Sequence, residues 1–184
     1  MEVFIISPTE KGGRLWEPSD ELASQCKPYS AIEMNDRWLL TQPEVHTLSC
    51  GAHTPEQVDQ HLGAFEASLD LNGQDEAVFV RLDRSRQEID HFCTECQKCL
   101  PCPEDIRIPE ILRMRNGIKA FQMADNFRER YNQITPGDRW FGGAFGNACT
   151  DCGDCLPRCP EKLPIPDLLR ESHNILYRPP EPTE

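Results

Sequence analysis

Closely spaced cysteines are the feature that most limits what this 184-residue chain can fold into. Eight of its ten cysteines lie in two short runs, each ending in Cys-Pro, and only Cys26 and Cys50 stand apart. The runs are Cys93, Cys96, Cys99 and Cys102, and Cys149, Cys152, Cys155 and Cys159. Disulfides inside such short loops would be strained, so this many neighbouring thiols favours metal ligation.

The spacing within the runs indicates the kind of metal centre. The second run reads C-x2-C-x2-C-x3-C-P, which is the ligand spacing of two-cluster bacterial ferredoxins, and the first run is one residue shorter. Two residues between ligands let a tight turn direct successive thiolates at one cubane, and in ferredoxins the fourth cysteine ligates the other cluster. We therefore expect two 4Fe–4S clusters. The expected ligands are Cys93, Cys96, Cys99 and Cys159 for the first, and Cys149, Cys152, Cys155 and Cys102 for the second.

Zinc is the alternative metal. Two four-cysteine zinc sites would use paired C-x2-C knuckles from separate turns, and four ligands in one run fit that arrangement less well. Cys26 and Cys50 are expected to be buried small hydrophobic residues. The five histidines have no ligand-spaced carboxylate, and we expect them to be structural or exposed; they are His46, His53, His61, His91 and His173. No catalytic motif and no phosphate-binding glycine loop is present.

The charge balance narrows the choice of partners. The chain has 19 basic and 31 acidic side chains, for a formal net charge of −12, which argues against binding to nucleic acid or to an anionic membrane. No apolar stretch is long enough for a membrane span or a secretory signal, so we expect a cytoplasmic protein. Glu95, Asp151 and Asp154 lie between the ligands and should lower the reduction potentials, whereas Lys98 and Arg158 oppose them.

Residues 1–72 are expected to alternate strands and helices. The apolar run Val3 to Ile6 predicts a strand buried on both faces, and residues 45–50 predict a second strand. Ser19 and Ser30 are expected to begin helices. Residues 54–57, Thr-Pro-Glu-Gln, combine an N-cap threonine with proline at the first helical position, and residues 72–73, Asn-Gly, are expected to end that helix.

Residues 73–178 are expected to form a mainly helical domain, followed by a disordered tail at 179–184. Helices are predicted at about 75–89, 108–117 and 118–131, with a last one that starts at Ile165. Each cysteine run is followed by the same order of features: a short polar stretch, Ile-Pro and a helix. Such an internal duplication would place two clusters side by side between helices.

At this level of detail the chain resembles a known family. Residues 3–13, 38–43 and 45–57 resemble the end of an aldo/keto reductase barrel, from its seventh strand to its eighth helix. Residues 99–103, Cys-Leu-Pro-Cys-Pro, and the Ile-Pro that follows resemble the C-terminal iron–sulfur domain of a ferredoxin-containing subset of that family. The resemblance implies an α+β chain: a βαβα remnant of a (β/α)8 barrel over 1–72, then an α-helical two-cluster ferredoxin-type domain over 73–178.

The resemblance also implies limits on activity. Aldo/keto reductases transfer hydride from NADPH with an Asp, Tyr, Lys and His tetrad on early strands; here only two of eight strands are present and the tetrad is absent. The counterparts of the family's cofactor-loop positions are Ser7, Gly51, Thr54 and Gln57, although Thr54 and Gln57 equally fit helix capping. One turn further on, the family often has an acidic residue followed by Asn, and this chain has Gln60 and His61 at those positions.

The leading expectation is therefore an iron–sulfur electron-transfer protein that acts with a redox partner protein. Because two strands cannot close a barrel, one candidate partner is a chain that supplies the missing barrel strands. The first alternative is the C-terminal piece of a split or truncated NADPH-linked oxidoreductase, and the lesser one is a zinc-binding interaction module. Whether the chain is itself an enzyme is left open by its sequence.

Overall fold

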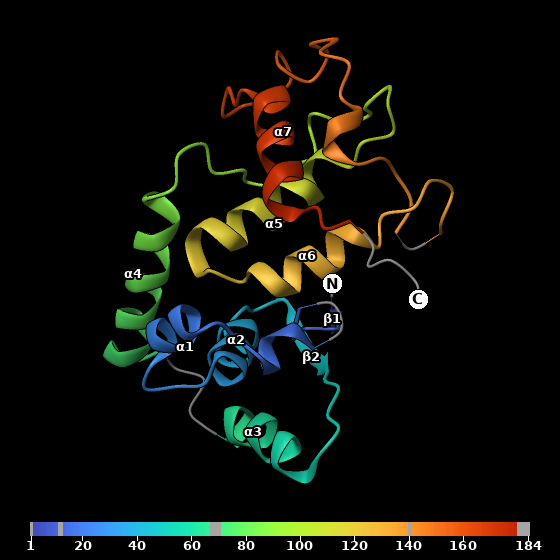
Figure 1. The fold of residues 1–184 in the computed structure, drawn as a ribbon. Helices are drawn as coiled ribbons and strands as arrows, with labels where there is room; N and C mark the ends of the chain where they lie inside the picture. Colours follow the sequence, from blue (N-terminus) through green and yellow to red (C-terminus); the bar gives the residue numbers. More distant parts are fainter. Residues whose placement is uncertain (1, 11–12, 67–70, 140, 180–184) are drawn as a thin grey trace. The chain divides into compact units, whose positions relative to one another are not determined.

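The computed structural model describes residues 2–10, 13–66, 71–139 and 141–179 (Figure 1). Over these residues the chain is mainly helical, with seven α-helices and one sheet of two short parallel strands. It divides into two compact units, Met1–Arg84 and Ser85–Glu184, so that the division falls inside α4 (Gly73–Gln87). The sequence pattern predicts this boundary at residue 72. Of the tail expected to be disordered, residues 180–184 lie outside the described residues.

The N-terminal unit is built on strands β1 (Val3–Ile6) and β2 (Val45–Ser49), which pair in parallel. Helices α1 (Asp20–Cys26) and α2 (Ala31–Leu40) connect them, and α3 (Pro55–Glu66) follows β2. The predicted helix starts are confirmed. Ser19 Oγ accepts a hydrogen bond from the Leu22 N–H, and Ser30 Oγ accepts one from the Glu33 N–H, each at 3.1 Å.

The prediction that β1 is buried on both faces is wrong. Phe4 is 61% exposed and Ile6 is 69% exposed, whereas Val3 and Ile5, on the opposite face, are half-buried. Because successive side chains of a strand point to opposite faces, one face of β1 is left without a covering layer by the described residues of this unit.

The expected helix end at Asn72 is also wrong, because Asn72 begins the next helix. Its Oδ1 accepts the Gln74 N–H at 2.8 Å, and α4 starts at Gly73. One turn later, Asp75 receives two hydrogen bonds of 2.9 Å from Arg37 of α2. Both side chains are buried. The Arg37 guanidinium lowers the pKa of Asp75 against the opposing effect of burial.

Replacing Asp75 by Ala should destabilise the N-terminal unit by about 3–5 kcal/mol, because Arg37 would remain buried without its partner. Hydrogen exchange of the α2 amides measures this as a loss of protection of roughly two to four orders of magnitude. Since the pKa of Asp75 is lowered on folding, the contribution is present above the ordinary aspartate pKa of about 3.9 and is lost as the pH falls through the lower folded value. Asp59→Ala, at an exposed position of α3, is the control; equal effects of the two variants would contradict the prediction.

The C-terminal unit packs three helices: α5 (Ile108–Phe121), α6 (Ala124–Asn132) and α7 (Ile165–Leu176). Its core includes aliphatic side chains on α5 and α7 that are almost fully buried: Ile108, Ile111, Leu112, Ile165, Leu169 and Leu176. The cysteine runs lie in the irregular segments that precede α5 and α7. Proline in the first turn of both helices confirms the Ile-Pro helix starts.

The expected helix break at Gly117 is wrong. Helix α5 continues to Phe121 and ends where Gln122 adopts a left-handed conformation, with φ of 53°, so α6 begins at Ala124 rather than Ile118. The glycine serves packing instead: a Cβ at position 117 would lie 2.0 Å from Cε2 of Phe127. Phe127 of α6 therefore rests directly on the α5 backbone.

Gly117→Ala should lower the free energy of unfolding by about 1–3 kcal/mol through overpacking against Phe127. Gly63→Ala in α3 is a matched control, because a Cβ there meets nothing within 4 Å and alanine favours helix. Thermal unfolding followed by circular dichroism compares them. A neutral or stabilising Gly117→Ala would show that α6 can move away without cost.

No helix in the described part of the chain has the length and apolar character needed to cross a bilayer.

Candidate metal centres

The two cysteine runs follow the same backbone path. In the first run Glu95 and Gln97 have positive φ, at 56° and 62°, and in the second run Asp151 and Gly153 occupy the equivalent positions, at 57° and 81°. These left-handed residues lie between consecutive cysteines. They reverse the chain locally, so that thiols two residues apart can turn toward one pocket.

The hydrogen bonds of the runs repeat as well. Leu100 N–H donates to the Gln97 carbonyl and Leu156 N–H donates to the Gly153 carbonyl, both at 3.0 Å. After the fourth cysteine, Asp105 N–H donates to the Cys102 carbonyl (3.1 Å). In the second half Lys162 N–H donates to the Cys159 carbonyl (3.2 Å). The internal duplication predicted from the sequence is therefore confirmed down to single backbone hydrogen bonds.

Two pockets of similar size lie among the cysteines. The first thiol pocket is lined by the thiol residues Cys93, Cys96, Cys99 and Cys159. The second thiol pocket is lined by Cys102, Cys149, Cys152 and Cys155, and also by Cys99. Each pocket thus contains three cysteines of one run and the last cysteine of the other, with Cys99 as an additional member of the second pocket.

Burial shapes the acidity of these thiols. It raises the pKa of Cys93 and Cys155, and that of Cys99 to about 11. Neighbouring thiols add to the effect across the two runs: Cys159 raises the pKa of Cys93, and Cys102 raises that of Cys155. A metal must displace these protons, because thiolate is the ligand form.

The donor set fits iron–sulfur clusters better than zinc. Leu112, Leu163 and Ile165 give the first thiol pocket an apolar wall, and Ile108 and Pro166 do so for the second. Three successive cysteines of a single turn, together with a distant Cys-Pro, match the ligand pattern of cubane clusters rather than that of paired zinc knuckles. Cys96 and Cys152 are the exposed members of the two sets.

Two arginines near the pockets were missed by the sequence analysis. Arg170 binds the Asp151 carboxylate at 2.8 and 2.9 Å, and Arg113 lies 3.8 Å from Glu95. Each arginine is the fifth residue after the isoleucine of an Ile-Pro, so the repeat itself carries the signal. The expected counter-charge Arg158 instead donates to two backbone carbonyls, those of Asp154 (2.7 Å) and Pro101 (3.3 Å), and so connects the two runs.

A buried tyrosine anchors the segment that leads into the second run. The Tyr131 hydroxyl accepts the Gly146 N–H at 2.8 Å and lies 2.8 Å from Nδ1 of His173. Burial raises the pKa of Tyr131 to about 12 and lowers that of His173. The phenol proton can therefore be donated to a neutral imidazole, which satisfies both side chains.

Tyr131→Phe should cost about 1–3 kcal/mol, since it leaves the buried Gly146 N–H and the His173 ring without their partner. Chemical denaturation measures the loss. Tyr177→Phe belongs to the same aromatic cluster but removes neither hydrogen bond, so it is the control. Equal stability of Tyr131→Phe and the wild type would mean that water replaces the phenol.

The N-terminal unit holds a further group of potential ligands. Asp36, Cys50 and His61 each offer an atom within 4.8 Å of the others, so His61 does have a carboxylate neighbour that the sequence analysis did not expect. Its Nδ1 lies 2.5 Å from Asp36 Oδ2, in a buried contact between α2 and α3. Ligand atoms on one tetrahedral zinc ion are about 3.4 Å apart, so this pair is better explained as a structural hydrogen bond.

The predicted cofactor-loop positions separate into two groups. Ser7 and Gly51 line one open pocket at the carboxyl ends of β1 and β2. Thr54 and Gln57 act as caps of α3: the Gln57 N–H donates to Thr54 Oγ1 (3.4 Å) and the His53 N–H donates to Gln57 Oε1 (2.6 Å). Cys26 is buried as expected, and Cys50 is half-buried.

Comparison with known families agrees with the geometry of the C-terminal unit. Residues 92–163, which contain both cysteine runs, match the family model described as a 4Fe-4S dicluster domain. No curated protein and no solved structure matches the chain. The chain therefore carries a ferredoxin-type domain that binds two 4Fe–4S clusters, and the cofactor prediction is confirmed. The family match does not extend to residues 1–91, so the relation to aldo/keto reductases stays a prediction.

Proposed function

We propose that this protein is a one-electron carrier whose first cluster is held by Cys93, Cys96, Cys99 and Cys159, and whose second is held by Cys149, Cys152, Cys155 and Cys102. The observation that carries the proposal is the lining of the two thiol pockets: each contains three cysteines of one run and the last cysteine of the other, and the second also contains Cys99. When bound, 4Fe–4S clusters supply reversible transfer of single electrons.

The chain contributes ligation, burial and charge around the pockets. The inner thiols Cys93, Cys99 and Cys155 are buried, which excludes water from that side. The exposed cysteines Cys96 and Cys152 mark the side of each pocket that a redox partner protein can approach. Negative charge beside a cluster lowers its reduction potential, and Arg113 and Arg170 partly offset the carboxylates that lie between the ligands.

The N-terminal unit is proposed to bind a partner chain that supplies neighbouring strands. Support comes from the uncovered face of β1, with Phe4 and Ile6 exposed, and from an apolar stripe on α3. The stripe consists of Val58, Leu62 and Phe65, which are 41–48% exposed. A two-stranded parallel sheet is rarely stable with one face in water, because parallel sheets are normally covered on both faces.

The same observation favours one alternative function, a piece of a split NADPH-linked oxidoreductase of the aldo/keto reductase type. In that case the open pocket at Ser7 and Gly51 would become part of a cofactor site only once the missing strands were present. Inspection of the three upstream reading frames for barrel strands separates the two functions. Barrel strands there would favour the split enzyme, and their absence would favour a freestanding redox protein.

The cluster-binding function is tested by anaerobic purification. The expected protein is brown and contains about eight iron and eight sulfide per chain, as two cubanes require. A colourless protein that contains zinc would contradict the proposal and favour an interaction module.

The exchange of the fourth cysteines is tested by Cys159→Ser and Cys102→Ser. Cys159→Ser should lose the spectroscopic signal of the first cluster, and Cys102→Ser that of the second, each retaining about four iron. Cys96→Ser and Cys152→Ser, at exposed positions, assign the two signals in electron paramagnetic resonance spectra of the reduced protein. Cys50→Ser lies outside the runs and should keep about eight iron. Loss of the second signal in Cys159→Ser would mean that each run serves a single cluster.

A further inference from the structure

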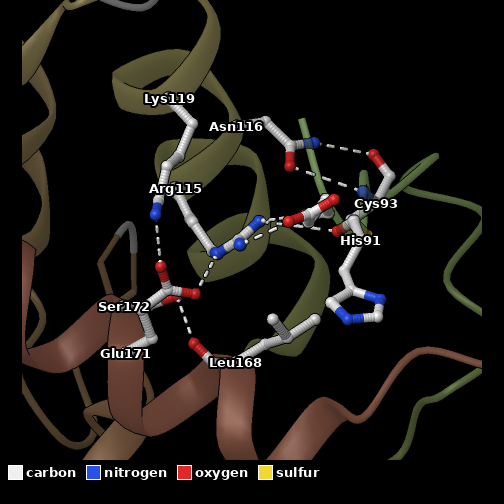
Figure 2. Close-up of polar contacts among 9 residues, drawn as sticks. His91, Cys93, Arg115, Asn116, Lys119, Leu168, Glu171 and Ser172 are labelled. Carbon is white, nitrogen blue, oxygen red and sulfur yellow. Dashed lines mark hydrogen bonds and ion pairs between the residues drawn. The ribbon is translucent and has the colours of Figure 1, made fainter. Parts of the chain in front are cut away.

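Asn116 is a buried polar residue of α5 whose side-chain oxygen and nitrogen both bind the backbone of one cysteine. It is 5% exposed and lies against Cys93, the first cysteine of the first run. Its Nδ2–H donates to the Cys93 carbonyl at 2.8 Å, and its Oδ1 accepts the Cys93 N–H at 3.4 Å (Figure 2). Both polar groups of the Cys93 backbone are therefore bound by one side chain.

A side-chain amide suits this pair of contacts, because it carries a donor and an acceptor side by side. The Cys93 carbonyl needs a donor and the Cys93 N–H needs an acceptor, and a carboxylate or an aliphatic side chain lacks one or both. Because Cys93 is buried, its peptide groups have no easy access to water. The helix thereby fixes the backbone of a cysteine that lies 23 residues away in the chain.

Arg115, which precedes Asn116 in α5, binds the backbone just before Cys93. Both terminal nitrogens of Arg115 lie 3.2 Å from the Asp90 carbonyl, and Nη1 is 3.5 Å from that of His91. Glu171 of α7 in turn receives Arg115 Nε at 2.6 Å and Lys119 Nζ at 2.6 Å (Figure 2). The segment that leads into the first run is thus bound at three backbone positions, those of Asp90, His91 and Cys93. Through Arg115, Glu171 of α7 is linked to this segment.

Over the described residues of the second half, the equivalent position does not make this contact. Asn116 and His173 are each the eighth residue after the isoleucine of their Ile-Pro, but His173 binds Tyr131 rather than a cysteine. The Cys149 N–H is bound by a carbonyl of its own loop, that of Gly146, at 3.3 Å. An effect of Asn116 should therefore be confined to the first thiol pocket.

We infer that Asn116 is a positioning residue for the first cluster: it holds the Cys93 peptide so that the Cys93 thiol stays in the first thiol pocket. The inference rests on the proposed ligand assignment. Groups that orient metal ligands typically contribute 10–100-fold in metal affinity, and the same range is expected here.

The test compares Asn116→Ala with Asn132→Ala in the full chain with both clusters loaded. Asn132 is a matched control, because its amide also binds backbone groups of the C-terminal unit, at Arg128, Leu176 and Arg178, but no cysteine. Iron release to a chelator is followed for each cluster, with the signals assigned by Cys96→Ser and Cys152→Ser. Asn116→Ala should release the first cluster about 10–100-fold faster than the wild type and leave the second unchanged. Asn132→Ala should affect neither selectively.

Asn116→Asp supplies a readout that loss of packing would not move. The carboxylate has nearly the same shape and can still accept the Cys93 N–H, but it cannot donate to the Cys93 carbonyl and adds negative charge. The reduction potential of the first cluster should fall relative to that of the second. If Asn116→Ala does not fold, the reduction potential of Asn116→Asp tests the inference in its place.

Two results would overturn the inference: equal acceleration of the loss of both clusters in Asn116→Ala, or an unchanged first cluster in both Asn116 variants. Failure of the proposed function is visible separately. In that case the wild-type protein would contain fewer than about eight iron per chain before any variant is compared.

Discussion

Thiols from two cysteine runs, separated by 46 residues of sequence, meet in each of the two pockets. The two runs must therefore be held close together, and the rest of the C-terminal unit serves this need. Helices α5, α6 and α7 form the core that keeps the runs together, and Arg158 connects them directly through the Asp154 and Pro101 carbonyls. Neither run could complete a four-thiol site of the observed kind without the other.

The sequence predicted those parts of the structure that depend on local rules. Cysteine spacing identified the clusters, the repeated Ile-Pro located α5 and α7, and serine caps located α1 and α2. The errors arose where a tertiary contact overrides a local preference. Gly117 reads as a helix stop, but its lack of a side chain is needed by Phe127, which comes ten residues later.

The residues around the pockets were harder to predict for the same reason. Asn116 has nothing in its local sequence that marks it as a partner of Cys93, because the contact exists only once α5 has folded back on the run. Arg113 and Arg170 could have been found by aligning the two halves of the repeat, since they occupy equivalent positions. The exposure of Phe4 and Ile6 could not have been predicted, because the sequence of an apolar strand is the same whether or not a neighbour covers it.

The two halves differ by one residue, and the place of that residue is informative. The first three cysteines and their left-handed turns recur after 56 residues, whereas the fourth cysteine and everything through the helix recur after 57. The additional residue is therefore absorbed in the Leu-Pro segment between the third and fourth cysteines. The spacing thus groups each fourth cysteine with the helix that follows it, whereas the three-cysteine turn keeps its own spacing. The cysteine at a constant distance from α5 is Cys102, which lines the second thiol pocket, and the cysteine at the same distance from α7 is Cys159, which lines the first.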